Sequence, residues 1–104
     1  MPLSFTINCP DHETASEIAD ALLGQHLVAC ANILPAIESR YHWKGRIERT
    51  REFPLVLKTS EELGDKVERA VRALHPYETP PILRDTFCAN ADYEAWIAAE
   101  TLSE

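Results

Sequence analysis

One continuous β-pattern, residues 36–59, constrains the fold of this chain more than any other feature. Lys44 to Arg46 supply the turn of the hairpin. Pro35 and Pro54 fall nearly opposite each other, and because proline donates no ladder hydrogen bond, they divide the hairpin into an inner part and an arm. At about 3.3 Å per residue, each strand of the arm, which runs from residue 36 to 53, reaches roughly 26 Å.

The register of the hairpin depends on the length of its loop. A three-residue loop places Trp43 opposite Ile47 and Ile37 opposite Phe53. A two-residue loop places charged residues opposite Trp43 and Ile37 instead. We therefore expect the three-residue loop, because it gathers the apolar side chains on one face.

The arm is too long for the helices of a small domain to cover. An isolated two-stranded ribbon is only marginally stable, and its edges invite further pairing. We therefore expect the arm to lie against neighbouring copies of the same chain; the alternative is an arm folded back onto its own sheet. The predicted interface residues are the large apolar side chains of the arm: Ile37, Tyr41, Trp43, Ile47 and Phe53.

The first third of the chain predicts a strand, a helix and a second strand. Residues 3–9 alternate between apolar and polar side chains, as in a half-buried strand. Asp11 is suited to cap a helix that stops near Gly24. Residues 27–34, "LVACANIL", are apolar on both faces and predict a central strand.

The last third predicts a helix, a strand and a further short helix. Thr59 and Glu62 form the pattern of a capping box for the second helix, which Pro76 ends. Residues 81–89 predict a strand and residues 90–102 a helix. The second helix has an apolar stripe (Leu63, Val67, Ala70, Val71 and Leu74), and the last is expected to be capped by Asn90 or Asp92 and to face inward with Tyr93, Trp96 and Ile97.

The order of these elements, βαββαβ followed by a helix, predicts an α+β fold of the ferredoxin-like sandwich type. In this fold two helices cover one face of an antiparallel sheet. The long hairpin lies in the middle of the element order, between the two helices. At 104 residues, with no repeat or linker, the chain is expected to form a single domain, residues 1–104.

Charge and composition exclude several classes of function. The net charge of −7 disfavours nucleic acid, and Glu48 and Glu52 interrupt the only basic stretch, residues 40–51. The third strand also lacks the Gly- and aromatic-rich signature of RNA-binding domains of the same topology. No apolar run approaches the roughly 20 residues of a membrane span, and the first residues do not read as a secretory signal, so we expect a cytoplasmic protein.

The cysteines do not predict a disulfide framework. Cys9, Cys30 and Cys88 are an odd number and lack the CxxC spacing of a zinc ribbon. Buried, reduced thiols are therefore the simplest expectation.

Four stretches resemble the CutA family of divalent-cation tolerance proteins. They are "CPDHETASEIA", "LVACANILPAIESRYHWKGRIE", "LVLKTSEE" and "LHPYETPPIL", in the family's order and over nearly the whole chain. The resemblance implies a ferredoxin-like homotrimer, similar to the PII signalling proteins, in which long hairpins join neighbouring subunits. It also implies tolerance and binding of copper or other divalent metals, with no established reaction and no required cofactor. Pro54 departs from the family pattern, which usually continues with strand-forming residues there.

By the same resemblance, Cys30 and His75 are the best candidate metal ligands, and Cys9 is a third. Thiolate and imidazole suit copper and zinc. The alternative is structural: Cys30 is then a small core residue, and His75 helps to end the preceding helix. An enzyme with Cys30 as nucleophile, His75 as base and Glu78 orienting the histidine is less favoured, because a thiol in an apolar run stays protonated.

The segment "LHPYETPPI", residues 74–82, predicts a rigid wall rather than a simple turn. Its prolines preset the backbone, so Tyr77 and Glu78 are aimed away from the helix axis. Lys58 is expected to supply a matching positive charge. We predict that these three residues line a pocket between subunits for a metal ion or small ligand. A helix-to-strand turn, or a trimer that only anchors another protein, is the alternative.

Overall fold

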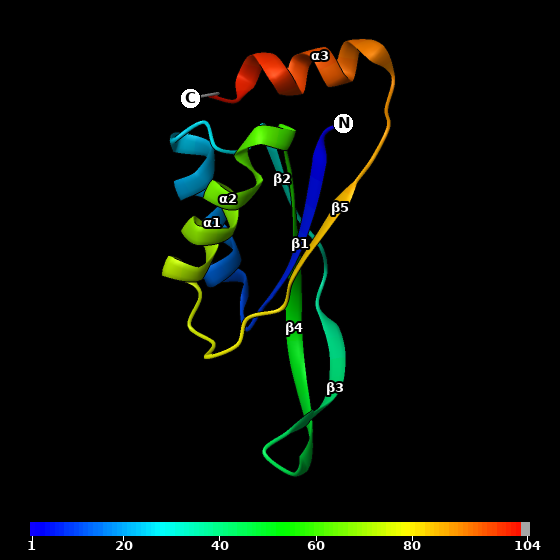
Figure 1. The fold of residues 1–104 in the computed structure, drawn as a ribbon. Coiled ribbons are helices and arrows are strands. Elements are labelled where there is room, and N and C mark those ends of the chain that lie inside the picture. Colours follow the sequence, from blue (N-terminus) through cyan, green and yellow to red (C-terminus); the bar gives the residue numbers. More distant parts are fainter. Residues whose placement is uncertain (103–104) are drawn as a thin grey trace.

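The computed structural model describes residues 1–102 as an α+β fold, in which helices pack on an antiparallel sheet (Figure 1). The strands are β1 (Leu3–Cys9), β2 (Cys30–Ile33), β3 (Ile37–Trp43), β4 (Arg46–Thr59) and β5 (Ile82–Thr86). The helices are α1 (His12–Gly24), α2 (Gly64–Leu74) and α3 (Ala91–Glu100), and the 3-10 turn η1 (Glu61–Leu63) precedes α2. This order confirms the predicted ferredoxin-like sandwich. Residues 103–104 of the predicted domain lie outside the described part.

The core lies between the sheet and the helices α1 and α2. Alternate residues of β1 and of the second half of β4 point toward these helices and are buried. The fully buried side chains at the centre are Phe5, Ile7, Ile18, Leu22, Leu55, Leu57, Val67 and Val71. The predicted helical stripe is confirmed except at Leu74, which is exposed at the end of α2. No helix in residues 1–102 is long and apolar enough to cross a bilayer.

Strand β4 organises the sheet, whose order is β2-β4-β1-β5. Its second half pairs with β1 on one side and β2 on the other, and its first half pairs with β3. The predicted strand at residues 27–34 is present as β2, but it lies at an edge of the sheet, so its predicted central place was wrong. The central place belongs to β4, because its fourteen residues are long enough to pair with three other strands.

The predicted division of the hairpin is confirmed. Three residues, 34–36, stand opposite two, 53–54, which makes a bulge between β2 and β3. The amide of Leu34 donates to the carbonyl of Pro54 at 2.9 Å, so the proline uses its acceptor and needs no donor. Beyond the bulge, β3 and the first half of β4 extend past the rest of the sheet as an arm (Figure 1).

The predicted three-residue loop was wrong by one residue. Trp43 pairs with Arg46 and Ile37 with Glu52, so the loop is Lys44–Gly45. Both loop residues have positive φ, 51° and 80°, which is the backbone of a type I′ turn. This turn matches the twist of the strands and outweighs the gathering of apolar residues on one face.

The start of α2 also differs from the prediction. The hydroxyl of Thr59 donates to the carbonyl of Leu27 at 2.6 Å and does not cap a helix. No side chain caps η1 or α2 in the structure. Thr59 is the last residue of β4 and fully buried, so its hydroxyl satisfies a buried carbonyl instead.

The C-terminal elements are close to the prediction. Strand β5 is shorter than the predicted strand at residues 81–89. Helix α3 begins after Asn90 and buries Ile97, whereas Trp96 is 42% exposed and does not face inward. The ring of Trp96 stacks on that of Tyr93, with 5.6 Å between centroids.

Candidate functional site

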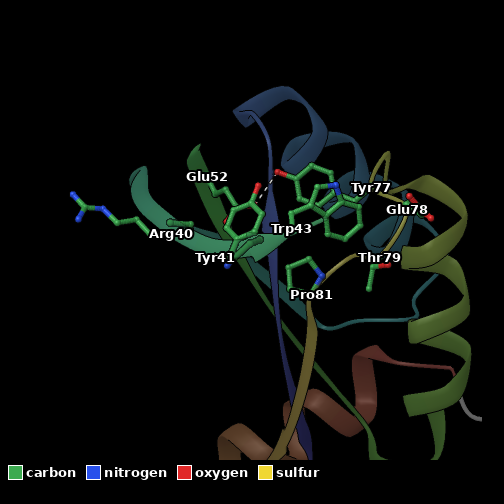
Figure 2. A pocket seen from close by; sticks show the side chains of 10 residues that line it. Arg40, Tyr41, Trp43, Glu52, Tyr77, Glu78, Thr79 and Pro81 are labelled. Carbon is green, nitrogen blue, oxygen red and sulfur yellow. Dashed lines mark hydrogen bonds between the residues drawn. The ribbon is translucent and has the colours of Figure 1, made fainter. Parts of the chain in front are cut away.

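A cleft of about 620 Å³ opens between the arm and the loop that follows α2 (Figure 2). The arm contributes one wall and the loop at residues 77–81 the other. Its lining residues are Asn8, Ser39, Arg40, Tyr41, Trp43, Glu52, Tyr77, Glu78, Thr79 and Pro81. Tyr77 and Glu78 line this cleft within a single chain, whereas the predicted pocket lies between subunits and stays a prediction.

A buried hydrogen bond joins the two walls of this cleft. The phenol of Tyr77 donates to Oε2 of Glu52 at 2.8 Å, and the Glu52 side chain is only 4% exposed. Figure 2 shows this contact together with the side chains of Tyr41 and Trp43, which line the same cleft. Burial, together with the hydrogen bond to Glu52, raises the pKa of Tyr77 above its usual range. Tyr77 therefore stays protonated and keeps its donor role.

The one-residue change in register explains why Glu52 faces the cleft. Cross-strand partners share a face, so Ile37, Tyr41 and Trp43 of β3 share theirs with the even-numbered residues of β4. Glu52 is one of these residues. The predicted register would have placed Phe53 there, and sequence reasoning therefore missed this carboxylate. A signal was available in the Lys-Gly pair, which is typical of a two-residue turn.

The charged residues at the rim already have partners. Nζ of Lys44 lies 4.0 Å from Oε1 of Glu78 and 5.6 Å from the centroid of the Trp43 ring. The guanidinium of Arg40 pairs with Glu38 at 2.9 Å and points away from the cleft (Figure 2). Among the charged residues that line the cleft, Glu52 is different, because it has no ion-pair partner within residues 1–102.

His75 holds the loop in place rather than facing the cleft. Its side chain is buried, Nε2 lies 2.8 Å from the carbonyl oxygen of Asn8, and Nδ1 accepts from the amide of Tyr77 at 3.2 Å. Because a carbonyl accepts and an amide donates, these contacts fix the neutral tautomer with its proton on Nε2. Both ring nitrogens are therefore occupied. The alternative role of His75, an interaction of its ring with the last carbonyls of α2, is not what the structure shows, because the ring contacts Asn8 and Tyr77 instead.

The candidate ligands Cys30 and His75 lie at opposite ends of the sheet. Cys30 is opposite Lys58, whose partner on β1 is Ser4, whereas His75 bonds to Asn8. Those two positions on β1 are about 13 Å apart at 3.3 Å per residue. One chain therefore brings together neither the predicted metal pair nor the nucleophile and base of the enzyme alternative.

The three cysteines have different surroundings, and all are free thiols. Cys9 is buried, which raises its pKa to about 11 and leaves it a protonated thiol. Sγ of Cys30 is half-buried and lies 3.6 Å from the hydroxyl of Tyr93, a contact that raises the tyrosine's pKa. Cys88 is exposed, so the expectation of buried thiols holds for Cys9 alone.

A metal centre is not assembled within one chain. No three His, Cys, Asp or Glu side chains in the described range are placed to hold an ion. Cys9 follows Asn8 at the same end of the sheet as His75, but it is a protonated thiol and the imidazole is fully bonded. The predicted ligands of a single chain therefore do not fit a metal ion.

Lys58 lies away from Tyr77 and Glu78 of its own chain. Its Nζ donates to Oδ1 of Asn32 at 3.4 Å, beside Cys30. This is the end of the sheet remote from Tyr77 and Glu78, and Lys44 takes the place beside Glu78 instead.

The predicted interface residues divide between the two faces of the arm. Tyr41 and Trp43, each 37% exposed, line the cleft of their own chain. Ile47 pairs with His42, faces the other way and is 74% exposed. Ile37 is 42% exposed, and the ring of Phe53 meets His12 edge-on. The arm thus contacts its own loop at the tip but keeps apolar surface exposed, and the oligomer stays a prediction.

Comparison with known proteins identifies one family. The family model described as CutA1 divalent ion tolerance protein matches residues 3–100. The divalent-cation tolerance protein CutA of Pyrococcus horikoshii is 40% identical over 93 residues, which is 88% of this chain and 90% of that protein. The human protein CutA is 36% identical over 98 residues, and the match spans 93% of this chain and 55% of the human one.

Solved structures of similar proteins have the same fold. The divalent cation tolerance protein from Thermus thermophilus superposes with a TM-score of 0.93 at 35% identity, covering 97% of this chain and 99% of that one. The CutA1 structure from the psychrotrophic bacterium Shewanella gives a TM-score of 0.94 at 32% identity, covering 98% and 96%.

Proposed function

Because this chain belongs to the CutA family of divalent-cation tolerance proteins, we propose that it is a homotrimeric, non-catalytic binding protein. In this proposal, its clefts take a small ligand or a metal ion such as copper, and occupancy is read by another protein, as in PII-like signalling. We place it in the cytoplasm, where its thiols stay reduced.

The cleft beside Tyr77 is the observation that carries this proposal. It has the volume of a small-molecule site, about 300–1,000 Å³, and its walls combine the aromatic side chains of Tyr41, Trp43 and Tyr77 with polar and charged groups. The Tyr77–Glu52 hydrogen bond ties the loop to the arm, so a ligand in the cleft contacts both. A site that touches both elements is suited to report its occupancy to the surface of the assembly.

The exposed arm supports the trimer. Ile47 and Ile37 expose large apolar side chains on a ribbon that carries an unpaired edge on β3. Sister chains that cover this surface would remove both features. Size-exclusion chromatography with light scattering tests the assembly: we expect three chains per particle, and a monomer at low micromolar concentration would contradict the proposal.

Metal binding requires ligands from more than one chain, because one chain does not assemble them. Calorimetric titration of Cu(I), Cu(II) and Zn(II) into the wild type and a Cys30→Ser/His75→Ala variant tests this part. Weaker binding by the variant is expected, and equal affinity would remove these residues as ligands. A trimer that binds no metal and no small ligand would instead favour an anchoring role.

A further inference from the structure

We propose that the cleft beside Tyr77 binds a small organic cation of the alkylammonium class, held between aromatic rings and the carboxylate of Glu52. This inference deepens the proposed function and rests on its claim that the cleft is a ligand site. It names the class of ligand from the charge and the wall chemistry of the cleft.

The charge of the cleft favours a cation. Glu52 is a buried side chain, 4% exposed, whose only hydrogen bond among the described residues comes from the neutral phenol of Tyr77. The basic residues nearby are used elsewhere, Arg40 by Glu38 and Lys44 by Glu78. A buried carboxylate without a cationic partner is costly, and a bound cation removes that cost.

The walls of the cleft favour an organic cation over a metal ion. Tyr41, Trp43 and Tyr77 line the same cleft as the carboxylate (Figure 2), and aromatic faces attract ammonium groups within about 6 Å of the ring centroid. The carboxylates of Glu52 and Glu78 are the only charged oxygen donors among the lining residues, and no His or Cys lies among them. Such a set is poor for zinc or copper, which take several nitrogen, sulfur or oxygen ligands.

The rim of the cleft already shows this mode of contact. The ammonium of Lys44 lies over the Trp43 ring, 5.6 Å from its centroid, and beside the carboxylate of Glu78. The same pairing of ring and carboxylate recurs deeper in the cleft with Tyr41, Tyr77 and Glu52, but without a lysine to fill it. We therefore place the head group of the ligand at Glu52.

Fluorescence of Trp43 offers a direct test. The chain has two tryptophans, so a Trp96→Phe variant leaves Trp43 as the single reporter in the cleft. Choline chloride is the probe, with sodium chloride matching its ionic strength. Its neutral isostere, 3,3-dimethylbutan-1-ol, has carbon in place of the charged nitrogen. We expect a saturable response to choline and at least tenfold weaker binding of the alcohol.

Variants then assign the binding to Glu52. In the same background, Glu52→Gln keeps an acceptor for Tyr77 and removes the charge, so choline binding is expected to weaken at least tenfold. Glu62→Gln, an exposed residue remote from the cleft, is the matched control and keeps full affinity. If Glu52→Gln does not fold by circular dichroism, Tyr41→Leu at a part-exposed position replaces it, with the same expected loss.

Three results would overturn the inference. The first is the absence of a saturable response to choline up to about 10 mM, which is ten times a dissociation constant of 1 mM. The second is equal affinity for choline and the alcohol. The third is full affinity in a folded Glu52→Gln or Tyr41→Leu protein. The first would also be seen if a sister chain filled the cleft. Trimer formation and metal titration are measured without choline, so their failure would contradict the proposed function separately.

Discussion

The hydroxyl of Tyr77 lies 2.8 Å from Oε2 of Glu52, a residue 25 positions earlier in the chain. This hydrogen bond connects the loop after α2 to the arm, and both of its residues line the cleft. Because the carboxylate is buried, the phenol is its main source of stabilisation, and the pair provides the first two predictions.

Replacing Tyr77 with Phe removes the donor and leaves the ring in place. We expect the free energy of unfolding to fall by about 1.5–3 kcal/mol, the usual contribution of a hydrogen bond to a charged group. Urea denaturation at pH 7 measures it. Tyr41→Phe is the control, since that hydroxyl only accepts a solvent-exposed 3.5 Å bond from Thr50, and its effect should be about 0.5 kcal/mol or less.

Alkaline pH tests the same bond in another way. The folded-state pKa of Tyr77 is raised above its ordinary value of 10.0, so its stabilisation is complete below pH 10 and is lost as pH rises further. We expect the stability of the wild type to fall more steeply above pH 10 than that of Tyr77→Phe. The other titrating groups are common to both proteins, so parallel curves would contradict the assignment.

The same substitution at two glycines should have opposite effects. Gly45 has φ of 80°, where a Cβ is strained, so Gly45→Ala should destabilise the protein by about 1–2 kcal/mol. Gly24 ends α1 with open space around it and no positive φ, so Gly24→Ala should stabilise by about 0.5–1 kcal/mol. Thermal unfolding of both variants decides; a stable Gly45→Ala protein would argue against the type I′ turn.

The contribution of Thr59 to the free energy of unfolding should come from its hydroxyl rather than from its shape. Thr59→Val keeps the volume but leaves the carbonyl of Leu27 without its 2.6 Å donor, and should cost about 1–3 kcal/mol. Thr59→Ser retains the donor and loses only a methyl group, so it should cost clearly less. If Val were tolerated better than Ser, packing would matter more than the hydrogen bond.

Native-state alkylation should label the three cysteines in a fixed order. Exposed Cys88 should react first with iodoacetamide at pH 8, half-buried Cys30 more slowly, and Cys9 only when the protein unfolds. Burial and a pKa of about 11 both suppress the Cys9 thiolate. Peptide mass spectrometry against time gives the order; equal rates for Cys9 and Cys88 would show that the Cys9 site opens readily.

The fold could be predicted because its local signals agree with one another. Residues 3–9 alternate, Asp11 accepts from the amide of Thr14 as a helix cap, and Pro76 closes α2. Each of these signals acts over a few residues, so no knowledge of the tertiary structure is required. The place of β2 in the sheet was harder, because an apolar strand looks alike at an edge and in the centre.

The cleft could be predicted only in part, because it depends on a register. Tyr77 and Glu78 are on a loop whose prolines point to a rigid wall, and both line the cleft. Glu52 was missed, because one residue of slip in the hairpin moves a side chain to the other face. Cys30 and Lys58 were proposed from their chemistry and from resemblance, without a register to place them, and they lie at the far end of the sheet.

The bulge opposite Pro54 separates the half of β4 that holds the core from the half that pairs with β3, the strand of Tyr41 and Trp43. Lengthening or shortening the ribbon beyond that point would move Tyr41 and Trp43 relative to Tyr77, while leaving the interior packing untouched. A change in ribbon length would therefore alter the shape of the cleft before it altered the packing of the core.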